Sequence, residues 1–149
     1  MKPSMSHMLL GAAAAITRDV IGHVNGDDYA RETLGTIGAM LMLMAQEAGR
    51  TADTLVTEQN ALRALFADAA ALPLDPNLRA RLSSASAQMG GSLKIEDLSE
   101  ETAQLNALLV ELHEAAEASA YDWAEALEAR IWEVLKLGAE CRAIYLPTL

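Results

Sequence analysis

The fold class of this chain is decided by residues 27–70, which read DDYARETLGTIGAMLMLMAQEAGRTADTLVTEQNALRALFADAA. A hydrophobic residue recurs at every seventh position of this stretch, and hydrophobic residues three positions further on accompany the repeat. The repeat consists of Leu34, Leu41, Ala48, Leu55, Leu62 and Ala69, and its companions are Ile37, Met44 and Leu65. A break near Gly49 would disturb the phase of this repeat. The pattern therefore predicts one long helix from residue 27 to about residue 70.

Start and stop signals on both sides of this stretch predict four more helices. Ser6 can cap a first helix, and the turn pair Asn25-Gly26 can end it. Asp75 can cap a short third helix, which Pro76 can open because proline fits the first helical position. Candidate caps for the last two helices are Asp97, Ser99 and Ser119. The expected helices cover residues 6–24, 27–70, 76–89, 97–118 and 119–146.

The composition agrees with a helical fold. Alanine, leucine and methionine are strong helix formers and dominate the hydrophobic 52% of the chain, whereas only six residues are aromatic. At 149 residues the chain is expected to form a single domain with one core. The short connection between the fourth and fifth helices makes them antiparallel neighbours. We therefore predict an all-α fold, an antiparallel helical bundle of four long helices with a short crossover helix.

The chain is strongly acidic, with 21 acidic and 11 basic residues and a net charge of −10. Such a chain is repelled by nucleic-acid phosphates and by anionic lipid, and no basic stripe offsets this repulsion. The apolar run at residues 34–45 is too short to span a bilayer. Cys141 is the single cysteine, so no intramolecular disulfide can form, which suits a reducing compartment. These features predict a cytoplasmic protein that binds neither nucleic acid nor membranes.

Residues 95–129 contain ten acidic residues and no lysine or arginine. Most of these acids are expected to lie opposite the apolar faces of the fourth and fifth helices, so a solvated acidic surface is the favoured interpretation. The alternative is a Mg²⁺ site formed by two pairs of glutamates, with one pair on each helix. These candidate ligands are Glu111, Glu114, Glu125 and Glu128. This alternative implies a Mg²⁺-dependent nucleotide hydrolase. The acidic helix pair resembles that of the all-helical nucleotide pyrophosphohydrolases, although the extra carboxylate of their motif is missing.

No other motif of catalytic chemistry is present. The three histidines, His7, His23 and His113, are scattered, and no His-x-x-x-His pair occurs among them. The chain has no Gly-x-Ser-x-Gly motif, and Cys141 falls on the apolar side of the fifth helix, where a buried and inert thiol is expected. We predict no catalytic residue and no cofactor, apart from Mg²⁺ in the alternative interpretation.

Two apolar features indicate a protein partner. From residue 37 to residue 45 the second helix is apolar around its whole circumference, so every side of it must be covered. Met42 and Leu43 point away from the seven-residue repeat, and Trp132 projects from the polar side of the fifth helix. Either the rest of the bundle covers these residues or a second copy of the chain does. We predict a homodimer with these three residues at its interface.

Three segments resemble a small, uncharacterised family of bacterial all-helical proteins. They are MLLGAAAAITRDVIGHVNGDDYARETLGTIGAMLMLMAQEAG at 8–49, AQLNALLVELHEA at 103–115 and CRAIYL at 141–146. Arg142, Tyr145 and Leu146 match the C-terminal end of that family, whereas an asparagine expected in the middle of the second helix is absent. The family occurs beside proteins that resemble aminoglycoside phosphotransferases and acyl-CoA dehydrogenases. The resemblance implies an accessory role, and with the apolar features it predicts a non-catalytic interaction protein that self-associates.

Overall fold

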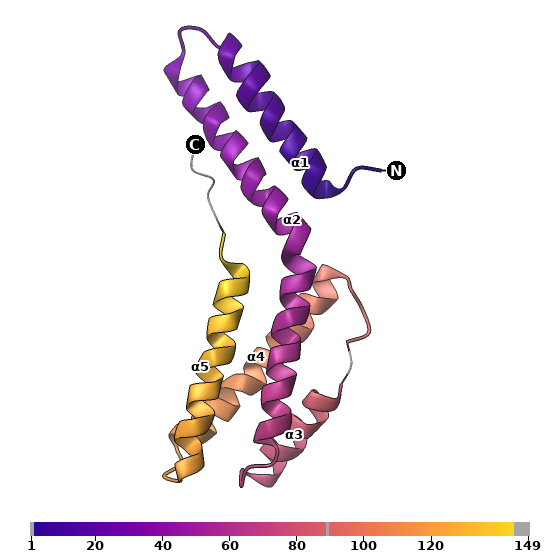
Figure 1. Cartoon of the computed structure of the whole chain (residues 1–149), viewed down its shortest axis with the longest axis vertical. Coiled ribbons are helices and arrows are strands. Elements are labelled where there is room, and N and C mark those ends of the chain that lie inside the picture. The colour runs from indigo at the N-terminus through magenta and orange to yellow at the C-terminus, as the bar shows by residue number, and fades with distance from the viewer. Residues whose placement is uncertain (1, 89, 145–149) are drawn as a thin grey trace. The chain divides into compact units, whose positions relative to one another are not determined.

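The computed structural model describes residues 2–88 and 90–144 and contains five α-helices (Figure 1). They are α1 (Met5–Ala14), α2 (Asp28–Ala69), α3 (Pro76–Ala87), α4 (Ile95–Glu117) and α5 (Asp122–Arg142). After α1 the chain continues as a π-helical segment, Ala15–Val20, and a 3-10 turn, Ile21–His23. The described residues contain no strand, so the all-α class is confirmed. None of these helices combines the length and the apolar character that crossing a bilayer requires.

The helix ends follow local hydrogen bonding. The side chain of Asp75 accepts hydrogen bonds from the backbone amides of Asn77 and Leu78, at 2.9 Å and 3.2 Å, and Pro76 opens α3 as predicted. The predicted cap of the first helix was wrong, because Ser4 and not Ser6 accepts the hydrogen bond from an amide of the first turn. The fourth helix begins at Ile95, two residues before its predicted cap, without a side-chain cap. The predicted helical residues 89, 145 and 146 lie outside the described residues.

Helix α2 is continuous through Gly49, as the seven-residue repeat predicts. The chain nevertheless divides into two compact units, which share α2 between them. Of the described residues, 2–51 and 144 belong to the first unit, and 52–88 and 90–143 belong to the second. The predicted single domain and the predicted four-helix bundle stay predictions.

In the first unit, α1 runs antiparallel to the first part of α2 (Figure 1). Gly26 makes the turn between them with a φ of +79°, a conformation that favours glycine. The helices approach closely at Gly38, where an added Cβ atom would lie only 3.0 Å from the methyl carbon of Thr17. Within the described residues 2–51, only Ala13, Gly38 and Ala45 are buried. This hairpin therefore has small residues at its contact and no core of large side chains.

The second unit has a conventional hydrophobic core. Its buried residues come from the second part of α2, the turn after it, α3, α4 and α5. They are Leu62, Leu65, Phe66, Ala69, Leu74, Leu82, Leu105, Leu108, Leu109, Leu112, Ala116, Leu127 and Ile131. The expected crossover helix α3 thus contributes a fully buried leucine, Leu82, to the core. Burial of a leucine side chain contributes roughly 1.5–3 kcal/mol, so α3 is an integral part of this unit.

Candidate functional site

The structure pairs two acids of residues 95–129 with arginines on other helices, Glu101 with Arg63 on α2 and Glu111 with Arg81 on α3. Both carboxylate oxygens of Glu111 accept hydrogen bonds from the guanidinium of Arg81 on α3, at 2.5 Å and 2.7 Å. These hydrogen bonds raise the pKa of Arg81 and lower the pKa of Glu111 from their ordinary values. Glu111 is therefore held by an arginine across an exposed helix–helix contact.

The structure does not gather the four candidate metal ligands into one group. Glu114 and Glu125 are exposed and Glu128 is half-buried, while Glu111 contacts Arg81. In residues 2–88 and 90–144, no three Asp, Glu, His or Cys side chains are grouped so that they could hold a metal ion. The Mg²⁺-dependent hydrolase stays a prediction that this arrangement does not favour.

The Arg81–Glu111 pair predicts how the carboxyl group of Glu111 titrates with acid. A carboxyl group with a lowered pKa stabilises the folded state above its unfolded pKa, and this contribution is lost as the pH falls through the folded pKa. We expect the NMR titration midpoint of the Glu111 side-chain carbon to lie below that of a free glutamate and to rise in Arg81→Gln. Arg79→Gln removes the same charge from α3 without these hydrogen bonds and serves as the control. An unchanged midpoint in Arg81→Gln would refute the pair.

The predicted interface residues differ in their exposure. Met42 and Leu43 are half-buried, whereas Trp132 is 62% exposed and its ring meets the edge of the His113 ring at 6.3 Å between centroids. Ile37, which lies in the segment that must be covered on every side, is exposed in the single chain. The reason is that α1, the helix packed beside it, contacts α2 through small residues.

Six of the exposed apolar residues of the first unit form two matching rows, and Leu10, Val20 and Tyr29 are exposed outside these rows. Each row has three members, which stand eight, five and one positions before a buried alanine. This alanine is Ala13 on α1 and Ala45 on α2. The rows are Met5, Met8 and Ala12 on α1, and Ile37, Met40 and Met44 on α2. Successive residues of a helix are rotated by about 100°, so the side chains of each row point about 80–140° away from the alanine that faces the other helix. The direction of this rotation is the same on both helices. Because the helices are antiparallel, both rows lie on one side of the hairpin, here called the methionine face.

Sequence reasoning selected Met42 and Leu43 but missed Met40 and Met44, which are 55% and 54% exposed. The seven-residue repeat includes Met44 among its companions and does not show that its side chain is exposed in the single chain. The signal that could have found the methionine face is the alanine-rich α1, because alanine and glycine bring two helices close together without covering their flanks.

Charge is distributed unevenly between the two units. Residues 1–51 carry five acids and four bases, whereas residues 52–149 carry sixteen acids and seven bases. The stretches 3–17 and 33–46, which contain both rows of the methionine face, have no Asp, Glu, Lys or Arg. The hairpin is therefore almost neutral in a strongly acidic chain, and its surface can approach another apolar surface without burying charge.

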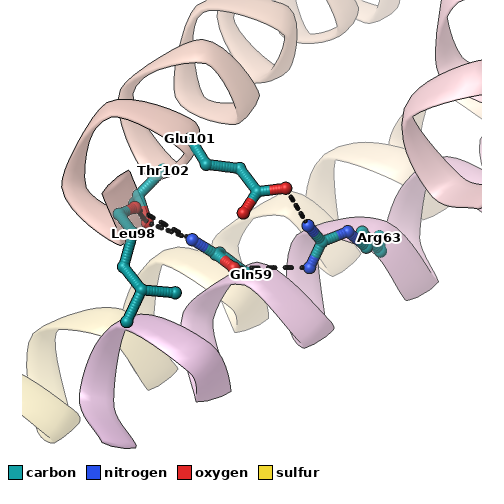
Figure 2. A network of polar contacts seen from close by, with 5 residues as sticks. All are labelled: Gln59, Arg63, Leu98, Glu101 and Thr102. Atoms are coloured by element: carbon teal, nitrogen blue, oxygen red, sulfur yellow. Dashed lines mark hydrogen bonds and ion pairs between the residues drawn. The ribbon is translucent and has the colours of Figure 1, made fainter. Parts of the chain in front are cut away.

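A buried polar network lies in the second unit, between α2 and α4 (Figure 2). The amide nitrogen of Gln59, a residue only 2% exposed, donates to the carbonyl oxygen of Leu98 at 2.9 Å and to Oγ1 of Thr102 at 3.1 Å. The guanidinium of Arg63 donates to Oε1 of Glu101 at 2.5 Å and to Oε1 of Gln59 at 3.5 Å. The network crosses from one helix to the other, so it fixes how α4 lies against α2.

A second buried polar contact joins α2 to the end of α5. Glu58 is almost fully buried, and its Oε2 accepts a hydrogen bond from the guanidinium of Arg142 at 2.5 Å. Gly138 leaves room for this carboxylate, since a Cβ atom there would lie 3.4 Å from Oε1 of Glu58. Sequence reasoning missed both Glu58 and Gln59. The signal was their position three and four residues after Leu55, on the apolar side of α2.

Comparison with protein-family models, with curated proteins and with solved structures gave no match.

Proposed function

We propose that this chain is an accessory interaction protein that associates with a second copy of itself through the methionine face. One observation carries the proposal: the hairpin buries only alanine and glycine while Met5, Met8, Met40 and Met44 are exposed. A helix with an apolar stripe is stable when that stripe is covered by another element. A second hairpin covers both rows at once.

Geometry supports a second copy as the occupant. Two helical hairpins that pack face to face make a four-helix arrangement, a common solution for helices with apolar faces. The segment from Ser4 to His23 is about 30 Å long, and a pair of helices is about 20 Å wide. The resulting flat footprint of about 600 Å² approaches the roughly 800 Å² that each partner of a stable interface buries. Protruding side chains make the buried area larger than this flat footprint.

Charge supports the same occupant and the same location. Two copies of the second unit repel each other, because each carries nine more acids than bases in residues 52–149. In the hairpin, by contrast, each copy carries only one more acid than bases. Self-association through the hairpin therefore avoids most of the electrostatic repulsion between copies.

Two single substitutions test where the copies meet. Met44→Lys is expected to lower the average mass in light scattering, because it places a charge within one row of the methionine face. Trp132→Lys changes an exposed aromatic residue on α5, outside the hairpin, and is expected to leave the mass unchanged. Tyr121→Lys, at another exposed aromatic residue, is the matched control.

The outcomes of this series separate the alternatives. A loss of association in Trp132→Lys alone would move the contact to α5 and contradict the hairpin. An unchanged mass in both Met44→Lys and Trp132→Lys would count against self-association through either surface. Far-ultraviolet circular dichroism of each variant checks that the helices persist.

A further inference from the structure

A hollow of about 410 Å³ lies in the second unit, beside the network of Figure 2. Its walls come from α2, from the end of α3 and from the segment that leads into α4, and they include Gln59, Arg63, Ser86, Gly90 and Ser92. A volume of this size falls in the range of sites that hold small molecules. The hollow is separate from the methionine face and from the Arg81–Glu111 pair.

Two acceptor oxygens converge beside Gly90. Because the Leu98 carbonyl can only accept, the amide nitrogen of Gln59 faces it and Oε1 faces the opposite way. From the described residues, this Oε1 receives only the long hydrogen bond from Arg63, and Oε2 of Glu101 receives none. A Cβ atom on Gly90 would lie 3.9 Å from the first oxygen and 3.5 Å from the second. The space beside Gly90 therefore suits a group that donates two hydrogen bonds, such as an amino group.

Asn60 adds a donor to the wall of the hollow. This residue is exposed and lines the hollow next to Gln59. Its side-chain amide carries N–H groups that can donate to an acceptor of a ligand. The hollow thus has an amide donor in its wall and two acceptors beside Gly90.

The charges beside the hollow select an uncharged ligand. Arg63 and Glu101 form an ion pair at 2.5 Å, so their charges compensate each other. A phosphate would be repelled by the Glu101 carboxylate, and an ammonium group would be repelled by the Arg63 guanidinium. We propose that this hollow binds a small uncharged molecule with an amino group beside a hydrogen-bond acceptor, as in primary amides and amino-substituted nucleobases.

Cytosine is a suitable probe, because its amino group lies next to a ring nitrogen acceptor. Titrated into the ¹⁵N-labelled full chain, it is expected to shift the Gln59 side-chain amide and the Gly90 backbone amide in a saturable manner. Gly90→Ala places a methyl group between the two acceptors and is expected to weaken cytosine binding by about tenfold or more. The variant is expected to fold, since those contacts are ordinary and Gly26 is the only glycine of the described residues with a positive φ.

Gly91→Ala is the matched control, because a Cβ atom there has nothing within 4 Å. Its cytosine affinity is expected to stay within about twofold of the wild-type value. The proposal is overturned if cytosine gives no saturable shift, or if Gly90→Ala binds it as well as Gly91→Ala does. It is also overturned if inorganic phosphate or methylammonium shifts the same signals more strongly than cytosine.

Discussion

The double substitution Met40→Lys/Met44→Lys is expected to turn the self-associated chain into a monomer. Both side chains lie in one row of the methionine face and are about half exposed in the single chain. Removing two methionines from an apolar contact costs roughly 3–6 kcal/mol, before the cost of burying two charges is added. Since 1.4 kcal/mol corresponds to a factor of ten, the dissociation constant is expected to rise by a factor of about 100 or more.

Light scattering after size-exclusion chromatography measures this change directly. Tyr121→Lys again serves as the control, because its side chain is exposed but lies outside the methionine face. Circular dichroism distinguishes dissociation from unfolding, since lysine is a good helix former and the helix content is expected to persist. An unchanged mass of the double variant, with intact helices, would contradict the location of the contact.

Phe66→Ala is expected to cause the largest loss of stability among single substitutions in the second unit. Phe66 is 0% exposed and is the only phenylalanine of the chain. Truncating a buried phenylalanine to alanine costs about 3–5 kcal/mol, because it removes burial and leaves a cavity. A protein of this size has about 5–15 kcal/mol of stability in total, so the loss is a large share of it.

Urea unfolding followed by circular dichroism measures the free energy of unfolding of this variant. Phe66→Leu is the matched control, because it keeps most of the apolar volume and is expected to cost less than about 1.5 kcal/mol. If both variants lost the same small amount, Phe66 would not occupy the centre of the core described here.

Much of the fold could be predicted from the sequence, and the reason is the apolar repeat of α2. An unbroken repeat through Gly49 predicts an unbroken helix, and α2 is continuous there. Asp75 and Pro76 predict the start of α3 because their chemistry acts within a few residues. The starts of α1 and α4 were less accurate. Several serines and acids near each start could cap a helix, and α4 has no side-chain cap.

The candidate sites were less predictable, because they depend on contacts between distant parts of the chain. Arg81 and Glu111 are 30 positions apart, and nothing in their local sequence pairs them. The approach of Glu101 and Gln59 to Gly90 likewise depends on how α4 lies against α2. The exposure of Ile37 in the single chain was not predictable either, because the pattern shows which residues are apolar but not which helix covers them.

Sedimentation equilibrium of the unmodified chain over a series of concentrations is the most direct test of self-association through the methionine face. We expect the average mass to rise from 15.9 kDa at high dilution toward twice that value. Added salt is not expected to dissociate the two copies, because the stretches that carry the methionine face contain no Asp, Glu, Lys or Arg. A mass of 15.9 kDa at every concentration would show that the chain does not self-associate.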